Sequence, residues 1–334
     1  MLPRVKPHVA AMATRRPAQW MPAAALATAA NHNVKQISVI GAGLMGAGIA
    51  QVAAHQAAVR VQLVDTSQAH LQKGESIILA SLKRIFKKKS ADAADAARQT
   101  DEVMARITLS TSTEQSAASS DVLVEAIVEN LEAKRRLFRQ LDAAAPAHAI
   151  FASNTSSLPI ADIAAAVSAT RRAQFAGLHF FNPVPQMKLV EVIRIGETQP
   201  QVFETLLALT KAMGKVPVSC KDTPGFIVNR LLVPYMFEAL RLVERGDATK
   251  EDVDTAMKLG AGYPMGPFEL MDYVGLDTTK FINDGWYQSG KGLQGSKLTE
   301  PSPLLDQLVA DGKFGRKSGE GFYAYGGVGA STKK

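Results

Sequence analysis

The chain has a single cysteine, Cys220, among its 334 residues, so it holds no internal disulfide framework. A lone cysteine is typical of a protein that folds in a reducing compartment, and its simplest interpretation is a small buried residue without a redox role. The sequence also lacks an apolar run of about 18 residues or more, so we expect no membrane-spanning segment. Hydrophobic residues still make up 46% of the chain, and this length accommodates two domains of ordinary size.

Acidic residues are absent from the whole stretch before Asp65, although the net charge of the chain is only +7. The first 33 residues combine many alanines with four basic residues, Arg4, Lys6, Arg15 and Arg16. This composition is typical of a mitochondrial presequence, so we predict that residues 1–33 are a leader and that the protein works in the mitochondrial matrix. A leader without function, or a misassigned start codon, is the alternative, and the protein would then be cytoplasmic. Beyond the leader the excess of positive charge is modest and does not indicate nucleic-acid binding.

A glycine-rich turn connects the first predicted strand, residues 34–40, to a helix of small residues over 44–55. In such a strand–turn–helix unit, Gly41 permits the tight turn, Gly43 lets the backbone approach a pyrophosphate, and Gly46 lets helix and strand pack closely. The helix N-terminus offers free N–H groups and the positive end of its dipole to phosphates. The pattern therefore predicts a dinucleotide site built from Gly41, Gly43, Leu44, Met45 and Gly46.

The second predicted strand, residues 61–65, ends in an acid. Asp65 lies 19 residues after Gly46, where a carboxylate can hydrogen-bond both ribose hydroxyls of NAD. The same carboxylate would repel the additional phosphate of NADP. The sequence therefore predicts NAD as the cofactor. The alternative for the whole pattern is a glycine-rich turn in another kind of α/β protein.

Apolar strands alternate with helical stretches from residue 34 to about residue 222. The strands expected, besides the first two, are 107–110, 122–127 and 150–153, and the further helices are 67–89, 91–105 and 131–144. This order predicts an α/β fold with a Rossmann-type, doubly wound, mostly parallel sheet. Two later apolar runs, 173–180 and 189–195, would extend the sheet on its far side.

The pattern changes at residues 222–225, Asp-Thr-Pro-Gly. Helical stretches follow over 226–245, 253–259, 267–274 and 276–287, with little strand pattern between them. We therefore predict an NAD-binding domain over 34–222 and a smaller, all-helical C-terminal domain over 223–334.

One histidine differs from the others in its position. His179 ends an apolar run just before a proline-bounded loop, and ligands bind at such strand ends in open α/β sheets. Three others lie in alanine-rich or polar helical contexts typical of ordinary surface: His55, His70 and His148. Imidazole suits general-base catalysis near neutral pH but needs an orienting acid. Glu191 lies inside an apolar strand, where a buried glutamate is rare unless it is paired. If the two strands are neighbours, the side chains of His179 and Glu191 can pair. The alternatives are that His179 is an ordinary core histidine and that Glu191 lies on an exposed strand face.

Over about residues 34–325 the chain resembles the short-chain L-3-hydroxyacyl-CoA dehydrogenases of fatty-acid β-oxidation, of the mitochondrial type. The matching segments are 41–51 (GAGLMGAGIAQ), 125–131 (EAIVENL), 151–158 (FASNTSSL), 175–184 (FAGLHFFNPV), 187–193 (MKLVEVI), 221–230 (KDTPGFIVNR), 262–272 (GYPMGPFELMD) and 314–323 (FGRKSGEGFY). The leader has no counterpart in this pattern.

The resemblance implies reversible oxidation of an (S)-3-hydroxyacyl-CoA, with His179 as the catalytic base and Glu191 as its partner. Ser156 and Asn229 are implied to contact the substrate, where their hydrogen bonds can fix the reacting oxygen beside the base. The implied cofactor neighbours are Glu129, Lys134, Ser156, Asn182 and Lys317. The implied contacts to coenzyme A are Ser81 and Lys88, besides Ser156 and Asn229. No metal is implied.

The resemblance also implies a homodimer, with the helix over 226–242 as candidate contact surface or as part of the core of its own domain. The C-terminal domain is expected to close over the substrate. Two other functions stay open. One is an NADPH-dependent 3-hydroxybutyryl-CoA dehydrogenase working reductively, which Asp65 disfavours. The other is a non-catalytic protein that binds NAD or coenzyme A on the same fold.

Overall fold

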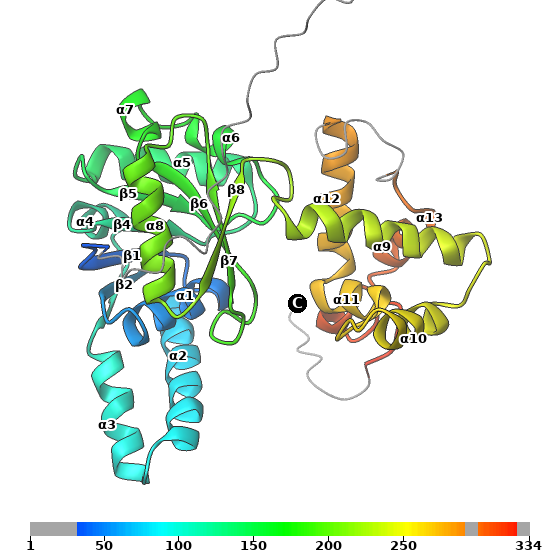
Figure 1. Ribbon diagram of the computed structural model, residues 1–334, viewed down its shortest axis with the longest axis horizontal. Coiled ribbons are helices and arrows are strands. Elements are labelled where there is room, and N and C mark those ends of the chain that lie inside the picture. Colours follow the sequence, from blue (N-terminus) through cyan, green and yellow to red (C-terminus); the bar gives the residue numbers. More distant parts are fainter. Residues whose placement is uncertain (1–31, 291–299, 326–334) are drawn as a thin grey trace, which may run out of the picture.

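The computed structural model describes residues 32–290 and 300–325, which form a larger α/β body and a smaller helical body (Figure 1). The larger body is built on one eight-stranded sheet in the order β3-β2-β1-β4-β5-β6-β7-β8. The strands are β1 (Gln36–Ile40), β2 (Arg60–Val64), β3 (Ile107–Ser110), β4 (Val122–Glu125), β5 (Ile150–Ser153), β6 (Phe175–Phe180), β7 (Leu189–Arg194) and β8 (Val216–Lys221). Strands β1 to β6 are parallel, β7 is antiparallel to β6, and β8 is parallel to β7.

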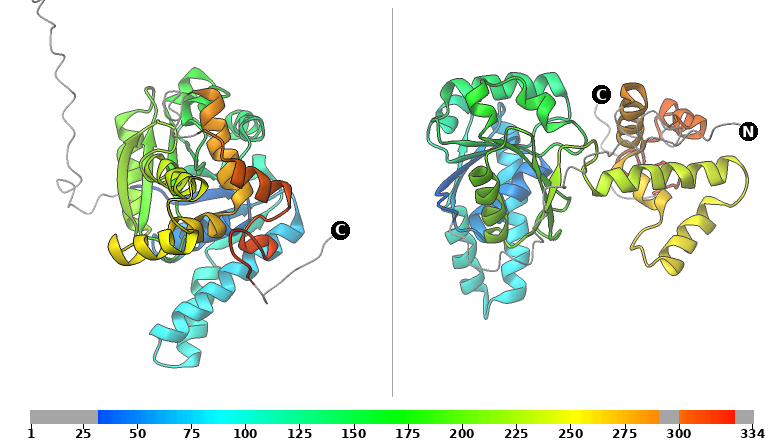
Figure 2. Two further views of the ribbon diagram at one scale, coloured as in Figure 1. Left: turned by 90° about the vertical axis from the view of Figure 1, so that its right-hand side faces the viewer. Right: turned by 45° about the horizontal axis from the view of Figure 1, so that its top comes forward.

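The predicted Rossmann-type, doubly wound sheet is therefore confirmed, and the two later apolar runs extend it on the far side as β6 and β7. Helices cover both faces (Figure 2). The helices of this body are α1 (Leu44–His55), α2 (Gln68–Lys89), α3 (Ala93–Met104), α4 (Thr113–Ala118), α5 (Leu131–Ala144), α6 (Ile160–Ala164), α7 (Ala169–Arg172) and α8 (Pro200–Ala212). One core packs α1, α2, α3 and α8 against the sheet, and a second core packs α4, α5 and α6 against its other face.

The smaller body contains helices only, apart from two isolated bridges, within the residues that the structure describes. Its elements are α9 (Val228–Glu244), α10 (Lys250–Gly260), α11 (Pro267–Val274), α12 (Leu276–Ser289), α13 (Pro303–Ala310) and the 3₁₀ turn η3 (Arg316–Ser318). A third core holds these helices together. The inner face of α9 belongs to this core, since Val233, Met236, Phe237 and Leu240 are buried there. The predicted helical second part of the chain is thus confirmed.

Strand β8 has no counterpart among the predicted elements. Pro217 lies inside it, and the polar residues Ser219 and Lys221 interrupt its apolar pattern. Proline cannot donate to a strand ladder, but β8 is an edge strand, where one side needs no partner. The predicted strand over 122–127 also ends early, at Glu125, because its carboxylate accepts the N–H of Ile127 and turns the chain.

Cys220 lies on β8 and is 5% exposed. Burial, together with the charges of Glu191 and Asp222, raises the pKa of its thiol to about 12. The thiolate is the reactive form, so a chromogenic disulfide reagent at pH 8 should label the native protein at least about 1,000-fold more slowly than the urea-unfolded protein. Equally fast labelling of both would show that the sheet edge opens readily.

Residues 1–31, which make up nearly all of the predicted leader, lie outside the described residues. In the described part of the chain, no helix combines the length and the apolar character needed to cross a bilayer.

Candidate active site

The glycine-rich turn lies between β1 and α1, at the point where the strand order reverses between β1 and β4. Gly41 has a φ of +106°, and a Cβ there would lie 2.5 Å from the carbonyl oxygen of Ala126. A Cβ on Gly46 would lie 1.7 Å from the carbonyl oxygen of Gly41, so this glycine is required by the turn itself as well as by helix packing. A Cβ on Gly43 would meet no protein atom within 4 Å, which fits a position kept small for a ligand.

The first turn of α1 offers its N–H groups without a competing side chain. Its N-cap, Gly43, makes no side-chain cap, and the first turn contains no acid. Leu44, which begins the helix, is 64% exposed. Free N–H groups and the helix dipole suit a pyrophosphate, so the residues present fit a dinucleotide.

Asp65 follows β2 immediately and lies beside this turn. Its Oδ2 accepts the N–H of Ala42 at 2.9 Å, and its Oδ1 accepts the N–H of Ser67 at 3.2 Å. His70 is a surface residue, as expected, but its Nδ1 lies 3.0 Å from Oδ1 of Asp65. Burial opposes ionisation of the Asp65 carboxyl, but these hydrogen bonds and His70 lower its pKa. The carboxylate is therefore charged at neutral pH.

His179 and Glu191 face each other across β6 and β7, at directly opposite positions of the antiparallel pair. Oε2 of Glu191 lies 2.7 Å from Nδ1 of His179, and both residues are buried. The rings of Phe181 and Phe226 lie against the imidazole, with centroids 4.4 and 5.5 Å away. A carboxylate at Nδ1 selects the tautomer in which Nε2 carries the free lone pair, and that nitrogen can accept a proton.

The second oxygen of Glu191 reaches the start of the helical body. Its Oε1 accepts the N–H groups of Ile227 and Val228, each at 2.9 Å. One carboxylate therefore holds both the imidazole and the N-terminus of α9. Asn229, on the first turn of that helix, donates from Nδ2 to the carbonyl oxygen of Ser156 at 3.0 Å. His179, Glu191, Ser156 and Asn229, which are far apart in the sequence, are thus linked by short contacts.

Glu129 shapes the segment that carries Ser156. Its Oε1 accepts the hydroxyl of Thr155 at 2.6 Å and the N–H groups of Ser156 and Ser157 at 2.8 and 3.1 Å. Burial alone would raise the pKa of this carboxyl, but Lys134 and these donors lower it. Glu129 is therefore an anchor for the loop after β5.

Lys134 lies behind Glu129. It is 1% exposed, and its Nζ lies 2.5 Å from Oε1 of Glu125 and 3.3 Å from Oε2 of Glu129. Burial raises the pKa of Glu125, although Lys134 and the hydroxyl of Ser153 oppose this. The ammonium of Lys134 is thus enclosed between the two carboxylates, and its place beside a cofactor stays a prediction.

The remaining predicted residues lie on other elements, and in the described part of the chain no hydrogen bond or ion pair joins them to the His179–Glu191 pair. Asn182 is exposed on the loop after β6, Ser81 is half-buried on α2, and Lys88 is exposed near the end of that helix. Lys317 lies in η3 of the helical body, where its ammonium forms an ion pair with Asp277.

Three residues of this region were not predicted. His70 pairs with Asp65, Glu125 anchors Lys134, and Val128 is 70% exposed on the loop after β4. The signal for Glu125 is the one that identified Glu191, an acid inside an apolar strand. The spacing of five residues between Asp65 and His70 carries no comparable signal. Among the described residues, no group of three or more histidine, cysteine or acidic side chains is placed to hold a metal ion.

A Rossmann-type sheet with an open glycine turn and a buried histidine–carboxylate pair defines a dinucleotide-dependent oxidoreductase. Two family models match the chain: the NAD binding domain of 3-hydroxyacyl-CoA dehydrogenase over residues 36–223, and the C-terminal domain of the same enzyme over 225–325. The chain belongs to the 3-hydroxyacyl-CoA dehydrogenase family, as the resemblance of its motifs predicted.

Individual relatives agree with this placement. The chain is 58% identical over 302 residues to the mitochondrial hydroxyacyl-coenzyme A dehydrogenase of Homo sapiens, covering 90% of this chain and 94% of that protein. It is similar to the crystal structure of FadB2 from M. tuberculosis, with a TM-score of 0.80 and 39% identity over 87% of this chain and 99% of that one. The (S)-3-hydroxybutyryl-CoA dehydrogenase PaaH1 from Ralstonia eutropha also gives a TM-score of 0.80 and 39% identity, covering 88% of this chain and all of that one.

Proposed function

We propose that this enzyme oxidises (S)-3-hydroxyacyl-CoA to 3-oxoacyl-CoA with NAD in fatty-acid β-oxidation, and that His179 is its general base. The observation that carries the proposal is the buried pair formed by Nδ1 of His179 and Oε2 of Glu191. It lies at the carboxyl end of β6, beside the segment of Ser156 and the start of α9.

In the proposed reaction, Nε2 of His179 takes the proton of the C3 hydroxyl. Glu191 holds the ring through Nδ1 and stabilises the imidazolium that forms. A bound NAD, held at the glycine turn and Asp65, would supply the acceptor for the hydride of C3; the alcohol would then lose one proton and one hydride and become a ketone. Ser156 and Asn229 would orient the reacting oxygen. The aromatic rings of Phe181 and Phe226 limit the access of water to the imidazole.

The choice of NAD rests on Asp65. Replacement by alanine removes the charge that would repel the additional phosphate of NADPH, so the preference for NADH should fall at least about tenfold. The comparison of kcat/KM for NADH and NADPH measures this. Asp65→Asn keeps an acceptor for the N–H of Ala42 and should lose much of the preference as well. An unchanged preference in both variants would place cofactor selection elsewhere.

The decisive experiment follows the absorbance of NADH with acetoacetyl-CoA as substrate, beside a parallel reaction with NADPH. Rapid loss of NADH and little use of NADPH supports the proposal. Activity with NADPH alone would identify a reductive 3-hydroxybutyryl-CoA dehydrogenase. Binding of NADH without any turnover would favour a non-catalytic protein.

We further propose a mitochondrial matrix location, a homodimer, and a domain boundary near residue 222. The location rests on the composition of the leader and on the mitochondrial relatives. The dimer is supported by apolar side chains left exposed on the helical body: Leu231 at 68%, Leu259 at 83% and Phe281 at 59%. The boundary is supported by the end of β8 at Lys221. Closure of the helical body over the substrate remains part of this proposal.

A further inference from the structure

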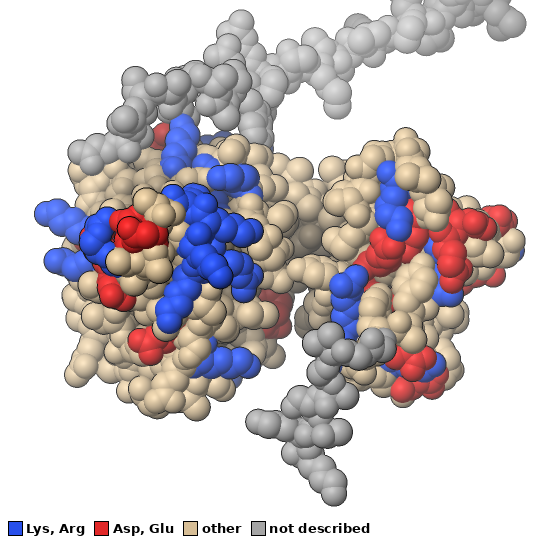
Figure 3. Space-filling view, turned by 90° about the horizontal axis from the view of Figure 1, so that it is seen from below, with Lys and Arg blue, Asp and Glu red and all other residues tan. Residues whose placement is uncertain are grey.

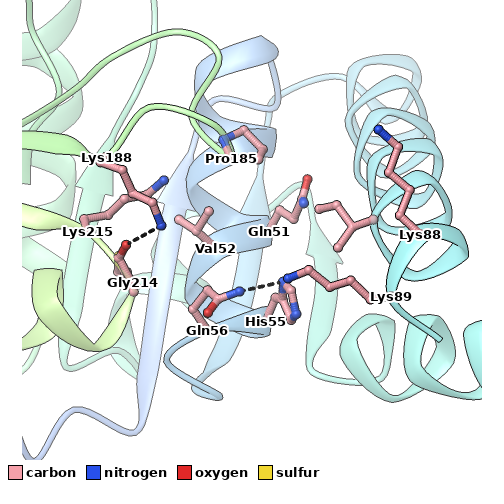
Figure 4. A pocket seen from close by; sticks show the side chains of 12 residues that line it. Gln51, Val52, His55, Gln56, Lys88, Lys89, Pro185, Lys188, Gly214 and Lys215 are labelled. Atoms are coloured by element: carbon pink, nitrogen blue, oxygen red, sulfur yellow. Dashed lines mark hydrogen bonds between the residues drawn. The ribbon is translucent and has the colours of Figure 1, made fainter.

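The two ends of α2 carry charge of different kinds. Basic residues gather on the face of the larger body where this helix ends (Figure 3), and lysines there help to line a pocket of about 330 Å³ (Figure 4). The first turn of α2, at its opposite end, contains no acidic residue. It holds His70, whose ring lies beside Asp65, the acid that follows β2. A group that can change its charge near neutral pH therefore lies against the acid on which the choice of cofactor rests.

The hydrogen bonds of Asp65 place His70 in competition for one of its oxygens. Oδ2 of Asp65 accepts the N–H of Ala42 at 2.9 Å. Oδ1 accepts the N–H of Ser67 at 3.2 Å and lies 3.0 Å from Nδ1 of His70. A carboxylate oxygen accepts about two hydrogen bonds, so Oδ1 is fully used while His70 pairs with it. His70 therefore controls whether both oxygens of Asp65 are open to the hydroxyls of a ribose.

His70 is the member of this pair that can respond to a ligand. Its side chain is 65% exposed, whereas that of Asp65 is 15% exposed and held by two backbone N–H groups. An exposed ion pair contributes little free energy, so the imidazole can exchange this contact for one to a ligand without a large loss. Asp65 is thus the fixed acid of the site, and His70 is its adjustable neighbour.

The charge beside the imidazole comes mainly from Asp65. The N–H of Asp65 donates to the carbonyl oxygen of Ser110, so the ends of β2 and β3 lie together here. In the described part of this region, the segments that follow β1 and β3, residues 41–44 and 110–113, contain no titratable side chain. Lys73, one turn further along, is the nearest charged residue of the same helix. The net charge at Asp65 therefore depends on the protonation of His70.

We propose that His70 is a specificity-determining residue, whose protonated imidazole lets the site accept the 2′-phosphate that distinguishes NADPH from NADH. The inference rests on the proposed function, because it assumes that the dinucleotide lies at the glycine turn with Asp65 as the acid that selects NAD. A neutral His70 leaves the charge of Asp65 uncompensated, and the phosphate is repelled. An imidazolium compensates that charge and can pair with the phosphate, as a nearby arginine does in sites that take NADP.

The test measures the dissociation constants of NADH and NADPH by fluorescence titration, without turnover. An imidazole gains its charge between pH 8 and pH 6, but a phosphate monoester gains a proton there as well, so proteins are compared at one pH. At pH 6, His70→Gln should favour NADH at least about threefold more than the wild type does. At pH 8 these two proteins should agree within about twofold.

A fixed charge tests the same idea from the other side. His70→Arg carries its charge at either pH, and its planar guanidinium suits a phosphate, so at pH 8 its preference for NADH should be at least about threefold weaker than that of the wild type. The matched control is His148→Gln, which removes another exposed histidine beside an acid, with Nε2 3.3 Å from Oδ1 of Asp121. Asp121 accepts the N–H of Lys35 just before β1, at the opposite edge of the sheet, so this control should match the wild type at both pH values.

Two results would overturn the proposal: the same preference for NADH in His70→Gln and the wild type at pH 6, or an unchanged preference in His70→Arg at pH 8. These titrations do not depend on the reaction. If the wild type binds both dinucleotides and turns over neither with acetoacetyl-CoA, the proposed function fails, and the titrations still decide the role of His70.

Discussion

Replacement of His179 by alanine is expected to lower kcat with NADH and acetoacetyl-CoA by at least about 100-fold, the usual contribution of a general acid–base group. In the direction of reduction, the imidazolium supplies the proton that the new hydroxyl requires, and alanine has none to give. The loss should appear in kcat more than in the affinity for NADH, because the glycine turn and Asp65 follow other strands, β1 and β2. Stopped-flow absorbance measures the turnover, and NADH fluorescence measures the binding.

Two further variants test whether the loss of turnover is specific to the imidazole of His179. His148→Ala removes an exposed histidine whose ring lies 3.3 Å from Asp121, and it should leave kcat unchanged within about twofold. His179→Asn keeps a polar side chain in the buried site and should remain as slow as the alanine variant. Turnover of His179→Ala close to the wild-type value would exclude His179 as the base, provided that its thermal unfolding resembles that of the wild type.

The sequence was informative wherever a local rule governs the structure. The spacing of glycines at 41, 43 and 46 requires a particular turn, and the turn identifies the fold. The pairing of His179 with Glu191 could be anticipated because a buried acid in an apolar strand needs a partner, and adjacent strands bring one within reach.

What sequence reasoning missed depends on tertiary contacts that no local pattern records. Strand β8 is hard to predict from the sequence because it contains Pro217, and proline is tolerated in a strand only at a sheet edge. Whether a strand lies at the edge depends on the whole sheet. The link between Glu191 and the N–H groups of Ile227 and Val228 joins residues 36 and 37 positions apart. Likewise, lysines near residues 88, 188 and 215 line one pocket. Their proximity follows from the assembly of α2, β7 and β8 and has no local signal in the sequence.

Substitution of Glu191 by glutamine should reduce kcat by at least about 100-fold, although the side chain keeps its size. The amide oxygen can replace Oε1 as acceptor for Ile227 and Val228, which places the NH₂ group against Nδ1 of His179. Nδ1 must then accept, so the proton moves to Nε2, and the nitrogen that should take the substrate proton already carries one. The charge that stabilises the imidazolium is lost as well. Stopped-flow absorbance of NADH with acetoacetyl-CoA measures the kcat of this variant.

Glu191→Ala separates the chemical role of this carboxylate from its structural one. Alanine leaves the N–H groups of Ile227 and Val228 and the buried imidazole without their acceptor, which should cost about 3 kcal/mol or more of unfolding free energy. Glutamine keeps the anchor of α9 and should unfold at a temperature much closer to that of the wild type. The variant His179→Ala/Glu191→Gln should be little slower than His179→Ala alone, since the two side chains act as one unit. Multiplicative losses in kcat for the double variant would instead show that Glu191 contributes to turnover independently of His179.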